Sequence, residues 1–164
     1  MRTVTAEEIE LYLDELDEMP EEKSEDLVNE LSEKQGFIMA YLLAVEHDSF
    51  DEYERDGFFY LGLSLWYIMQ NLNPEIHVIT EEEIEASEHN NFKMLDVMSD
   101  ETEAGMTKII ELIVENYSQP NLFGYIVEAL MEIDEDDEEP IYHPDHSGMM
   151  LIYLKTVIDC FDKH

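Results

Sequence analysis

The stretch GFFYLGLSLWYIM at residues 57–69 determines the fold. Its apolar side chains cover nearly all sides of a helix, which is typical of a helix at the centre of a core. Asp48 or Ser49 supplies the expected N-cap. The helix should end at Leu72, because Pro74 follows and a proline lacks the backbone donor that a further turn needs. The pattern therefore predicts one long central helix around which the rest of the chain packs.

Capping signals place two further helices. Thr5 and Glu8 form a capping box in front of a helix over residues 5–18, and Thr80 and Glu83 form another in front of a helix over residues 80–98. The short segment 75–80 resembles a strand but is isolated, so we expect a connector there.

The remaining elements follow from apolar residues at helical spacing. Pro20 ends the first helix, Ser24 is the expected N-cap of the second, and that helix continues to Val45. Later helices are expected over residues 101–118, 120–133 and 145–161. We therefore predict a single all-α domain over residues 1–164, a bundle of about six or seven helices.

The order of elements occurs twice along the chain. Residues 37–46 end one helix, an acidic loop follows, and a second, apolar helix starts at Gly57. Residues 123–132 likewise end a helix, an acidic loop follows, and an apolar helix starts at Gly148. This register places Glu46 opposite Glu132. A repeat would give two stacked αα-hairpins, each preceded by an acidic helix. The alternative is that any two helical hairpins look alike, and the sequence favours it, because the order matches better than the residues do.

The charge restricts the classes of partner. Eight Lys and Arg face 42 Asp and Glu, so the formal net charge is −34 at pH 7. Self-repulsion at this charge destabilises a compact state, and stability should therefore rise with salt. Direct binding to nucleic acid or to an anionic membrane is disfavoured, whereas cations and basic proteins are attracted. The first residues carry no secretory signal, and no apolar run is long enough to span a bilayer, which favours a cytoplasmic protein.

Motifs of nucleophilic and phosphate chemistry are absent from the sequence. The single cysteine, Cys160, lies on the predicted last helix, where the neighbouring Asp159 and Asp162 should raise the pKa of its thiol. Two arginines, Arg2 and Arg55, offer little grip for an anionic substrate. We therefore predict a protein that is not an enzyme and uses no cofactor.

His143, Asp145 and His146 are candidate metal ligands, since imidazole and carboxylate suit a first coordination shell. The preceding segment 134–145 has the length of an EF-hand loop. However, Glu139 stands where that loop needs glycine, and its last position is Asp instead of the usual Glu. The alternative is a solvated acidic turn, which we favour because charge runs are usually solvated.

The first helix is unusually dense in charge. Residues 5–18 carry seven carboxylates along ~21 Å of helix axis, at a rise of ~1.5 Å per residue. One negative charge per ~3 Å is close to the ~3.4 Å spacing along a DNA strand. This favours a decoy for a nuclease or DNA-binding protein. Solubility alone is the alternative, although a net charge of magnitude ~2–8 would suffice for it.

We therefore predict an acidic binding module that engages a basic protein, in the manner of an inhibitor, an immunity protein or a DNA mimic. The likeness to those classes is one of charge and size only. Two alternatives remain: a metal-binding helical protein, and a structural helical protein, such as a homodimer, whose acidity serves solubility. The expected contact residues are the carboxylates of the first helix, the turn at residues 81–83 and the acidic loop: Glu7, Glu8, Asp14, Glu15, Asp17, Glu18, Glu81, Glu82, Asp134, Glu135, Asp136, Asp137, Glu138 and Glu139.

Overall fold

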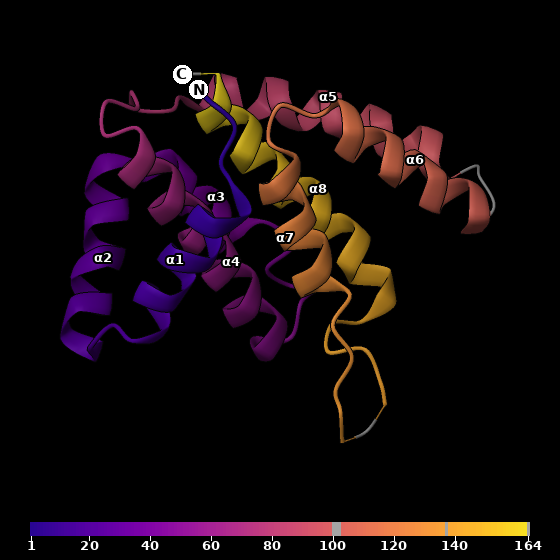
Figure 1. Ribbon diagram of the computed structural model, residues 1–164, viewed down its shortest axis with the longest axis horizontal. Coiled ribbons are helices and arrows are strands. Elements are labelled where there is room, and N and C mark those ends of the chain that lie inside the picture. The colour runs from indigo at the N-terminus through magenta and orange to yellow at the C-terminus, as the bar shows by residue number, and fades with distance from the viewer. Residues whose placement is uncertain (100–102, 137, 164) are drawn as a thin grey trace.

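The computed structural model describes residues 1–99, 103–136 and 138–163, and these form an all-α bundle (Figure 1). The described residues contain no strand, and one isolated bridge joins Ile133 to Pro140. Residues 76–80 form the predicted connector. The helices are α1 (Ala6–Asp17), α2 (Glu21–Lys34), α3 (Gly36–Ala44), α4 (Glu52–Leu72), α5 (Glu81–Ser99), α6 (Glu103–Asn116), α7 (Pro120–Leu130) and α8 (Pro144–Asp162).

The count of eight differs from the predicted six or seven because the second predicted helix is two helices. The chain breaks at Gln35, whose backbone leaves the helical region at φ −137° and ψ 56°. The break lets the Gln35 side chain bond the connector: its Nε2 donates to the carbonyl of His77 at 2.9 Å, and its Oε1 accepts from the backbone N–H of Ile79 at 2.9 Å. The N-cap of α2 is Pro20 and not the predicted Ser24.

Local capping signals account for the starts of α1, α4 and α5. Both predicted capping boxes are present, with Thr5 and Glu8 at α1 and with Thr80 and Glu83 at α5. The N-cap of α4 is Asp51 instead of Asp48 or Ser49. Asp51 is favoured because its carboxylate accepts the N–H of the third helical residue, which is itself a glutamate that bonds back to the N-cap backbone.

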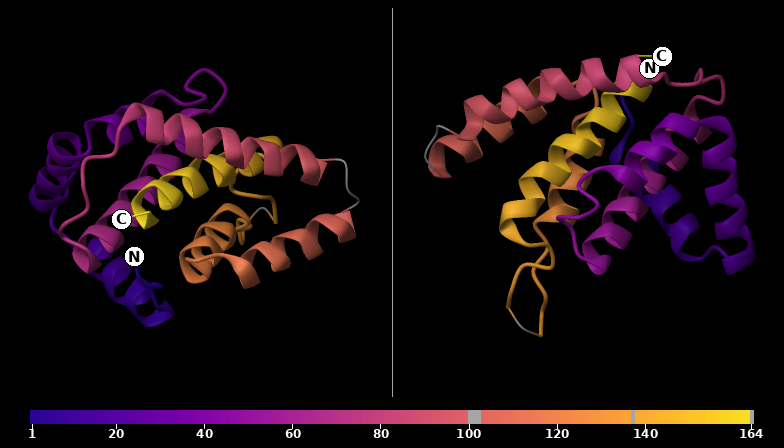
Figure 2. Two further views of the ribbon diagram at one scale, coloured as in Figure 1. Left: turned by 90° about the horizontal axis from the view of Figure 1, so that it is seen from above. Right: turned by 180° about the vertical axis from the view of Figure 1, so that it is seen from behind.

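Two long helices share the centre of the bundle. The prediction of a central helix is confirmed for α4, where Phe58, Leu65, Trp66 and Met69 are buried. The equally buried α8 packs against α4, α5 and α7. Figure 2 shows α5 lying along α8, while α6 diverges from α5 and packs against α7. The buried apolar residues form one continuous cluster with contributions from α1 to α5, α7 and α8.

The predicted hairpins are present as α3–α4 and α7–α8, and their long helices pack together. The two chain ends also meet, because the terminal ammonium donates to the carbonyl of Asp162 at 2.7 Å. Within the described part of the chain, none of the helices is long and apolar enough to cross a membrane.

Candidate functional site

A groove of about 600 Å³ lies between α1 and α7. Apolar side chains of both helices line it, with Ile9 and Leu13 from α1 and Tyr125 from α7. We call it the α1–α7 groove; its lining is Ala6, Ile9, Glu10, Leu13, Asp14, Asp17, Val114, Pro120, Asn121, Gly124, Tyr125 and Glu128.

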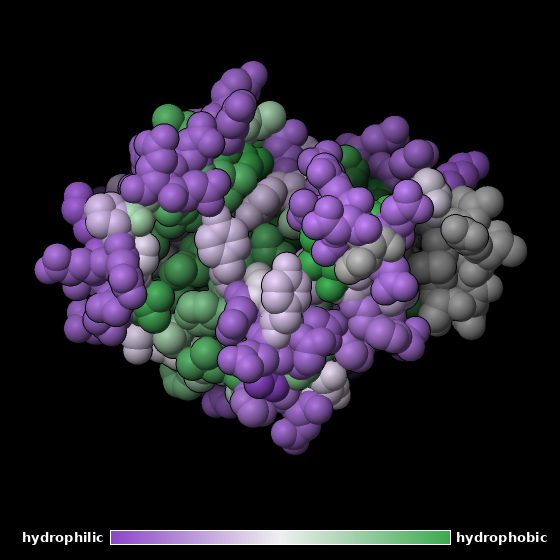
Figure 3. Space-filling view, turned by 90° about the horizontal axis from the view of Figure 1, so that it is seen from below, coloured by the Kyte–Doolittle hydropathy of each residue, from purple (hydrophilic) through white to green (hydrophobic). Residues whose placement is uncertain are grey.

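Negative charge borders this groove on both sides. Of the described residues that line it, four are carboxylates and none is Lys or Arg. Glu10, Asp14 and Asp17 follow each other along α1, and Glu128 stands on α7. An apolar floor between acidic edges therefore faces solvent. The face of the molecule seen from below shows the same combination, with apolar side chains in a hollow between hydrophilic ones (Figure 3).

Most of the predicted contact carboxylates are exposed, but they do not form one surface. Of those at α1, only Asp14 and Asp17 line the groove. Glu81 and Glu82 open α5, and the loop residues 134–136 and 138–139 project from the end of the molecule opposite the start of α5 (Figure 1). The placement of Asp137 lies outside the described residues. The exposed members are Glu7, Asp14, Glu15, Asp17, Glu18, Glu81, Glu82, Asp134, Glu135, Asp136, Glu138 and Glu139.

Glu8 pairs with a basic side chain, whereas Glu15 and Asp17 each accept a hydrogen bond from a tyrosine hydroxyl. Its Oε2 accepts from the Arg2 guanidinium at 2.9 Å and from the backbone N–H of Thr5 at 3.0 Å. The hydrogen bond from Arg2 and the bond from Thr5 lower the pKa of Glu8 to about 2. Glu8 thus fixes the start of α1, and the carboxylates further along the helix carry the exposed charge.

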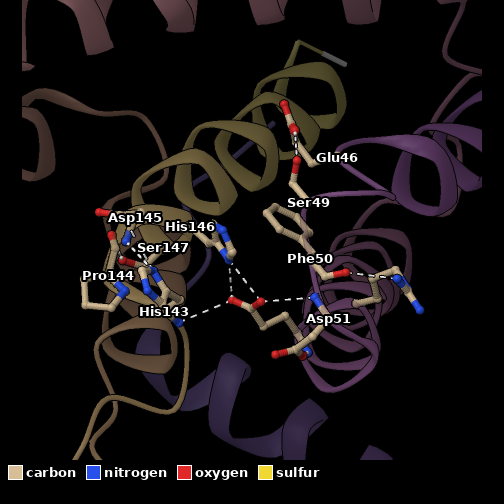
Figure 4. A network of polar contacts seen from close by, with 11 residues as sticks. Glu46, Ser49, Phe50, Asp51, His143, Pro144, Asp145, His146 and Ser147 are labelled. Carbon is tan, nitrogen blue, oxygen red and sulfur yellow. Dashed lines mark hydrogen bonds and ion pairs between the residues drawn. The ribbon is translucent and has the colours of Figure 1, made fainter.

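The candidate metal ligands have other partners in the structure. His143 is the N-cap of α8, where its Nδ1 accepts from the backbone N–H of Asp145 at 3.2 Å. The Nδ1 of His146 lies 2.8 Å from the carboxylate of Glu54. Figure 4 shows His146 pointing from α8 toward Phe50 and Asp51 at the start of α4. Among the described residues, no group of three His, Cys, Asp or Glu is arranged to hold a metal ion.

Glu54 is a buried carboxylate that sequence analysis did not single out. Only 3% of the residue is exposed. Besides His146, it accepts from the backbone N–H groups of Asp51 and His143. The carboxylate therefore ties the starts of the two central helices together, and the helix dipoles favour its charge. The capping-box spacing from Asp51 to Glu54 was the available signal, but the partners on α8 are 89 and 92 residues away.

A second buried polar cluster joins α5 to α8. The Nζ of Lys155 donates to Asn91 Oδ1 at 2.9 Å and to Asp159 Oδ2 at 2.8 Å. Asn91 also donates to Asp159 and to the hydroxyl of Thr156. Tyr117 donates to Asp159, and Lys155 Nζ lies 4.5 Å from the centre of the Tyr117 ring. Every polar group named here has a partner, so this cluster serves the packing of helices.

Cys160 is a fully buried thiol. Burial raises its pKa to about 11, and Asp159 contributes to the increase. The predicted direction of the pKa shift is confirmed, although burial is its main cause. A thiol with this pKa stays protonated at neutral pH and is a poor nucleophile.

Comparison with protein-family models, with curated proteins and with solved structures found no match for this chain.

Proposed function

We propose that this protein is a non-enzymatic acidic binding module whose α1–α7 groove holds a basic amphipathic helix of a partner protein. The observation that supports it is the groove itself, with an apolar floor and four carboxylates at its edges. A helix laid in an apolar groove binds through apolar residues three and four positions apart. Lys and Arg at the sides of those residues would meet Glu10 and Asp14 on one edge and Glu128 on the other.

The overall charge supports the same partner. The eight Lys and Arg cannot neutralise 42 carboxylates, so a net negative field surrounds the molecule whatever internal pairs form. Such a field speeds the approach of a basic partner and weakens as salt is added. Nucleases and DNA-binding proteins are the partner classes that carry basic helices of this kind, because those helices enter the major groove of DNA.

A titration with a synthetic helical peptide tests this function. The probe has leucines on one face and lysines along both edges, and about three turns of helix match the length of α1. The groove variant Glu10→Gln, Asp14→Asn, Glu128→Gln removes three carboxylates from the groove. The control variant Asp134→Asn, Glu135→Gln, Asp136→Asn removes three from the loop and leaves the same net charge.

The expected result is that the groove variant loses at least about tenfold in affinity, equivalent to ~1.4 kcal/mol, while the loop variant changes little. Affinity for the unaltered protein should fall as salt rises. Equal losses in both variants, or affinity that salt does not change, would contradict the proposal, because the charge would then act without a site. A scrambled peptide of the same charge should bind more weakly, since it cannot fill the apolar floor.

The metal-binding and homodimer alternatives stay predictions.

A further inference from the structure

The two halves of the chain make the same helix contacts. In the first half α1 packs on α4, α2 on α3 and α3 on α4; in the second half α5 packs on α8, α6 on α7 and α7 on α8. The two halves meet where α4 packs against α8. This is the pattern expected of two units related by a two-fold axis that passes between α4 and α8.

Two buried glutamines, one in each half, make equivalent hydrogen bonds to the other half. Gln35 begins α3 and bonds the carbonyl of His77 and the N–H of Ile79, just before α5. Gln119 begins α7 and bonds the carbonyl of Arg2 and the N–H of Val4, just before α1. All four of these distances are 2.9 Å. The backbone angles of the two glutamines also agree, at φ −137° and ψ 56° against φ −123° and ψ 61°.

Each half therefore clamps the entry to the first helix of the other, and the exchange is reciprocal. Aligning the two capping boxes pairs the buried residues in front of them, Val4 and Ile79, which are both 0% exposed. Aligning the N-caps of α4 and α8 pairs Glu54 with His146, each the third residue of its long helix, and these two side chains meet at 2.8 Å between the halves.

These structural alignments of the two halves correct the alignment predicted from the sequence. Aligning the N-caps Asp51 and His143 places Gly57 opposite Met149, one position away from the predicted Gly148. Aligning the two glutamines places Glu46 opposite Leu130 and not opposite Glu132. Both helices and loops differ in length between the halves, as α1 with 12 residues and α5 with 19 show, and these differences shift the register between one helix pair and the next.

The α1–α7 groove lies between the first helix of one half and the third helix of the other. Its two-fold equivalent lies between α5 and α3, and the structure has a groove of about 300 Å³ there. We call it the α3–α5 groove; its lining is Phe37, Ala40, Tyr41, Ala44, Glu81, Ile84, Glu85 and Glu88.

The lining residues correspond position by position. Ile84 takes the place of Ile9, and Tyr41 takes the place of Tyr125. The environments of the tyrosines match in part: the hydroxyl of Tyr125 lies 3.1 Å from Ser64 Oγ, and that of Tyr41 lies beside the hydroxyl of Thr156 but also donates to Glu88 at 2.6 Å.

The second groove is also acidic and apolar, but its charge lies on one edge only. Three of its described lining residues, Glu81, Glu85 and Glu88, are glutamates of α5, and none is Lys or Arg. Phe37 is 49% exposed and offers an apolar surface that no part of the described chain covers fully.

We infer that the α3–α5 groove is a second docking site for a basic amphipathic helix, so that the protein holds two such helices related by its internal two-fold axis. The inference rests on the function proposed for the α1–α7 groove. Charge complementarity selects the occupant, because an apolar strip on α3 beside the row of glutamates on α5 suits a helix with Lys or Arg along one side of its apolar face. The smaller volume of the second groove makes it the weaker site.

Two matched substitutions block the grooves one at a time. Gly124 on α7 and Ala40 on α3 are equivalent positions, and each lines its groove. A Cβ at Gly124 meets no atom within 4 Å, and Ala40 is exposed, so a tryptophan at either position projects into groove space without entering the core. Ser32→Trp is the control, because Ser32 is exposed on α2 and lines neither groove.

The experiment is a calorimetric titration of each variant at low salt with the leucine and lysine peptide, after circular dichroism shows that each variant is folded. The unaltered protein and Ser32→Trp should bind at two sites. Gly124→Trp should remove the tighter site and Ala40→Trp the weaker one, and the double variant should bind at least tenfold more weakly at any site that remains.

Other outcomes separate the two claims. Binding at one site that Gly124→Trp removes and Ala40→Trp leaves unchanged would overturn the second site and leave the proposed function in place. Peptide binding that neither tryptophan changes would overturn both claims.

Discussion

The reciprocal clamp makes Gln119→Ala a demanding test of the fold. The substitution removes three hydrogen bonds: from the N–H of Val4, to the carbonyl of Arg2, and to Asp162 Oδ1 at 2.6 Å. Val4 is 0% exposed, so its N–H loses its partner where water cannot replace it. A stranded buried donor costs ~1–3 kcal/mol, and each bond that water can replace costs less. The expected loss in the free energy of unfolding is therefore about 2–4 kcal/mol.

Urea denaturation followed by the fluorescence of the single tryptophan, Trp66, measures this loss, because Trp66 is buried in the core. Gln35→Ala should cost a similar amount, since it strands the N–H of the fully buried Ile79. Asn90→Ala is a control on the exposed side of α5 and should change stability by no more than about 0.5 kcal/mol. A loss below about 1 kcal/mol for both glutamine variants would refute the reciprocal clamp.

Three further substitutions test local features. Gly124→Ala should raise the free energy of unfolding by about 0.5–1 kcal/mol, because it favours the helix and its Cβ meets no atom within 4 Å. Gly62→Ala should lower it by about 1–3 kcal/mol in the same urea assay, since its Cβ would lie 2.4 Å from Leu42 Cδ2; a gain at Gly62 would contradict the close packing of α3 on α4. Because the pKa of Glu8 is lowered in the folded state, ionised Glu8 stabilises the fold at pH values above its ordinary pKa of 4.5. This stabilisation should disappear as the pH falls toward about 2. In an NMR titration, Arg2→Gln should bring the pKa of Glu8 back toward 4.5; an unchanged pKa would show that Arg2 is not its partner.

The helices could be predicted from sequence because their signals are local. Capping boxes and apolar spacing lie within a few residues, and the hairpins follow from the order of helices. The break at Gln35 could not be predicted in this way. It depends on hydrogen bonds to residues 42 and 44 positions further along the chain, while the apolar spacing continues through it from Leu31 to Ile38.

The candidate site was only partly visible in the sequence for the same reason. The carboxylates of α1 were expected at the surface because charge is seldom buried without a partner, and most of them are exposed. The groove beside them needs α7, which follows α1 by more than a hundred residues. The two-fold relation was hidden in the sequence because most of the paired residues differ. Gln35 and Gln119 are one of the few identical pairs.

The two-fold relation also identifies what the cluster around Lys155 contributes. The register that pairs Glu54 with His146 places Leu63 at the position of Lys155 and Tyr67 at that of Asp159. The register of the capping boxes places Leu16 at the position of Asn91. One half of the molecule thus uses mainly apolar side chains where the other half uses an ionic network. The fold does not need the network at this place, even though the network is complete where it occurs.

Removing one member should therefore cost more stability than removing all of them. Lys155→Leu leaves Asp159 without its cation; that carboxylate is 19% exposed, so the expected loss is about 2–4 kcal/mol, somewhat below that of a fully buried pair. The combined variant Asn91→Leu, Tyr117→Phe, Lys155→Leu, Asp159→Phe leaves no charge of the network behind. It should be more stable than Lys155→Leu alone in urea denaturation, because well-packed apolar residues can replace a buried ion pair at little or no cost. If the combined variant is instead less stable than the single one, the network is required in this half, and the two halves hold their long helices in place by different means.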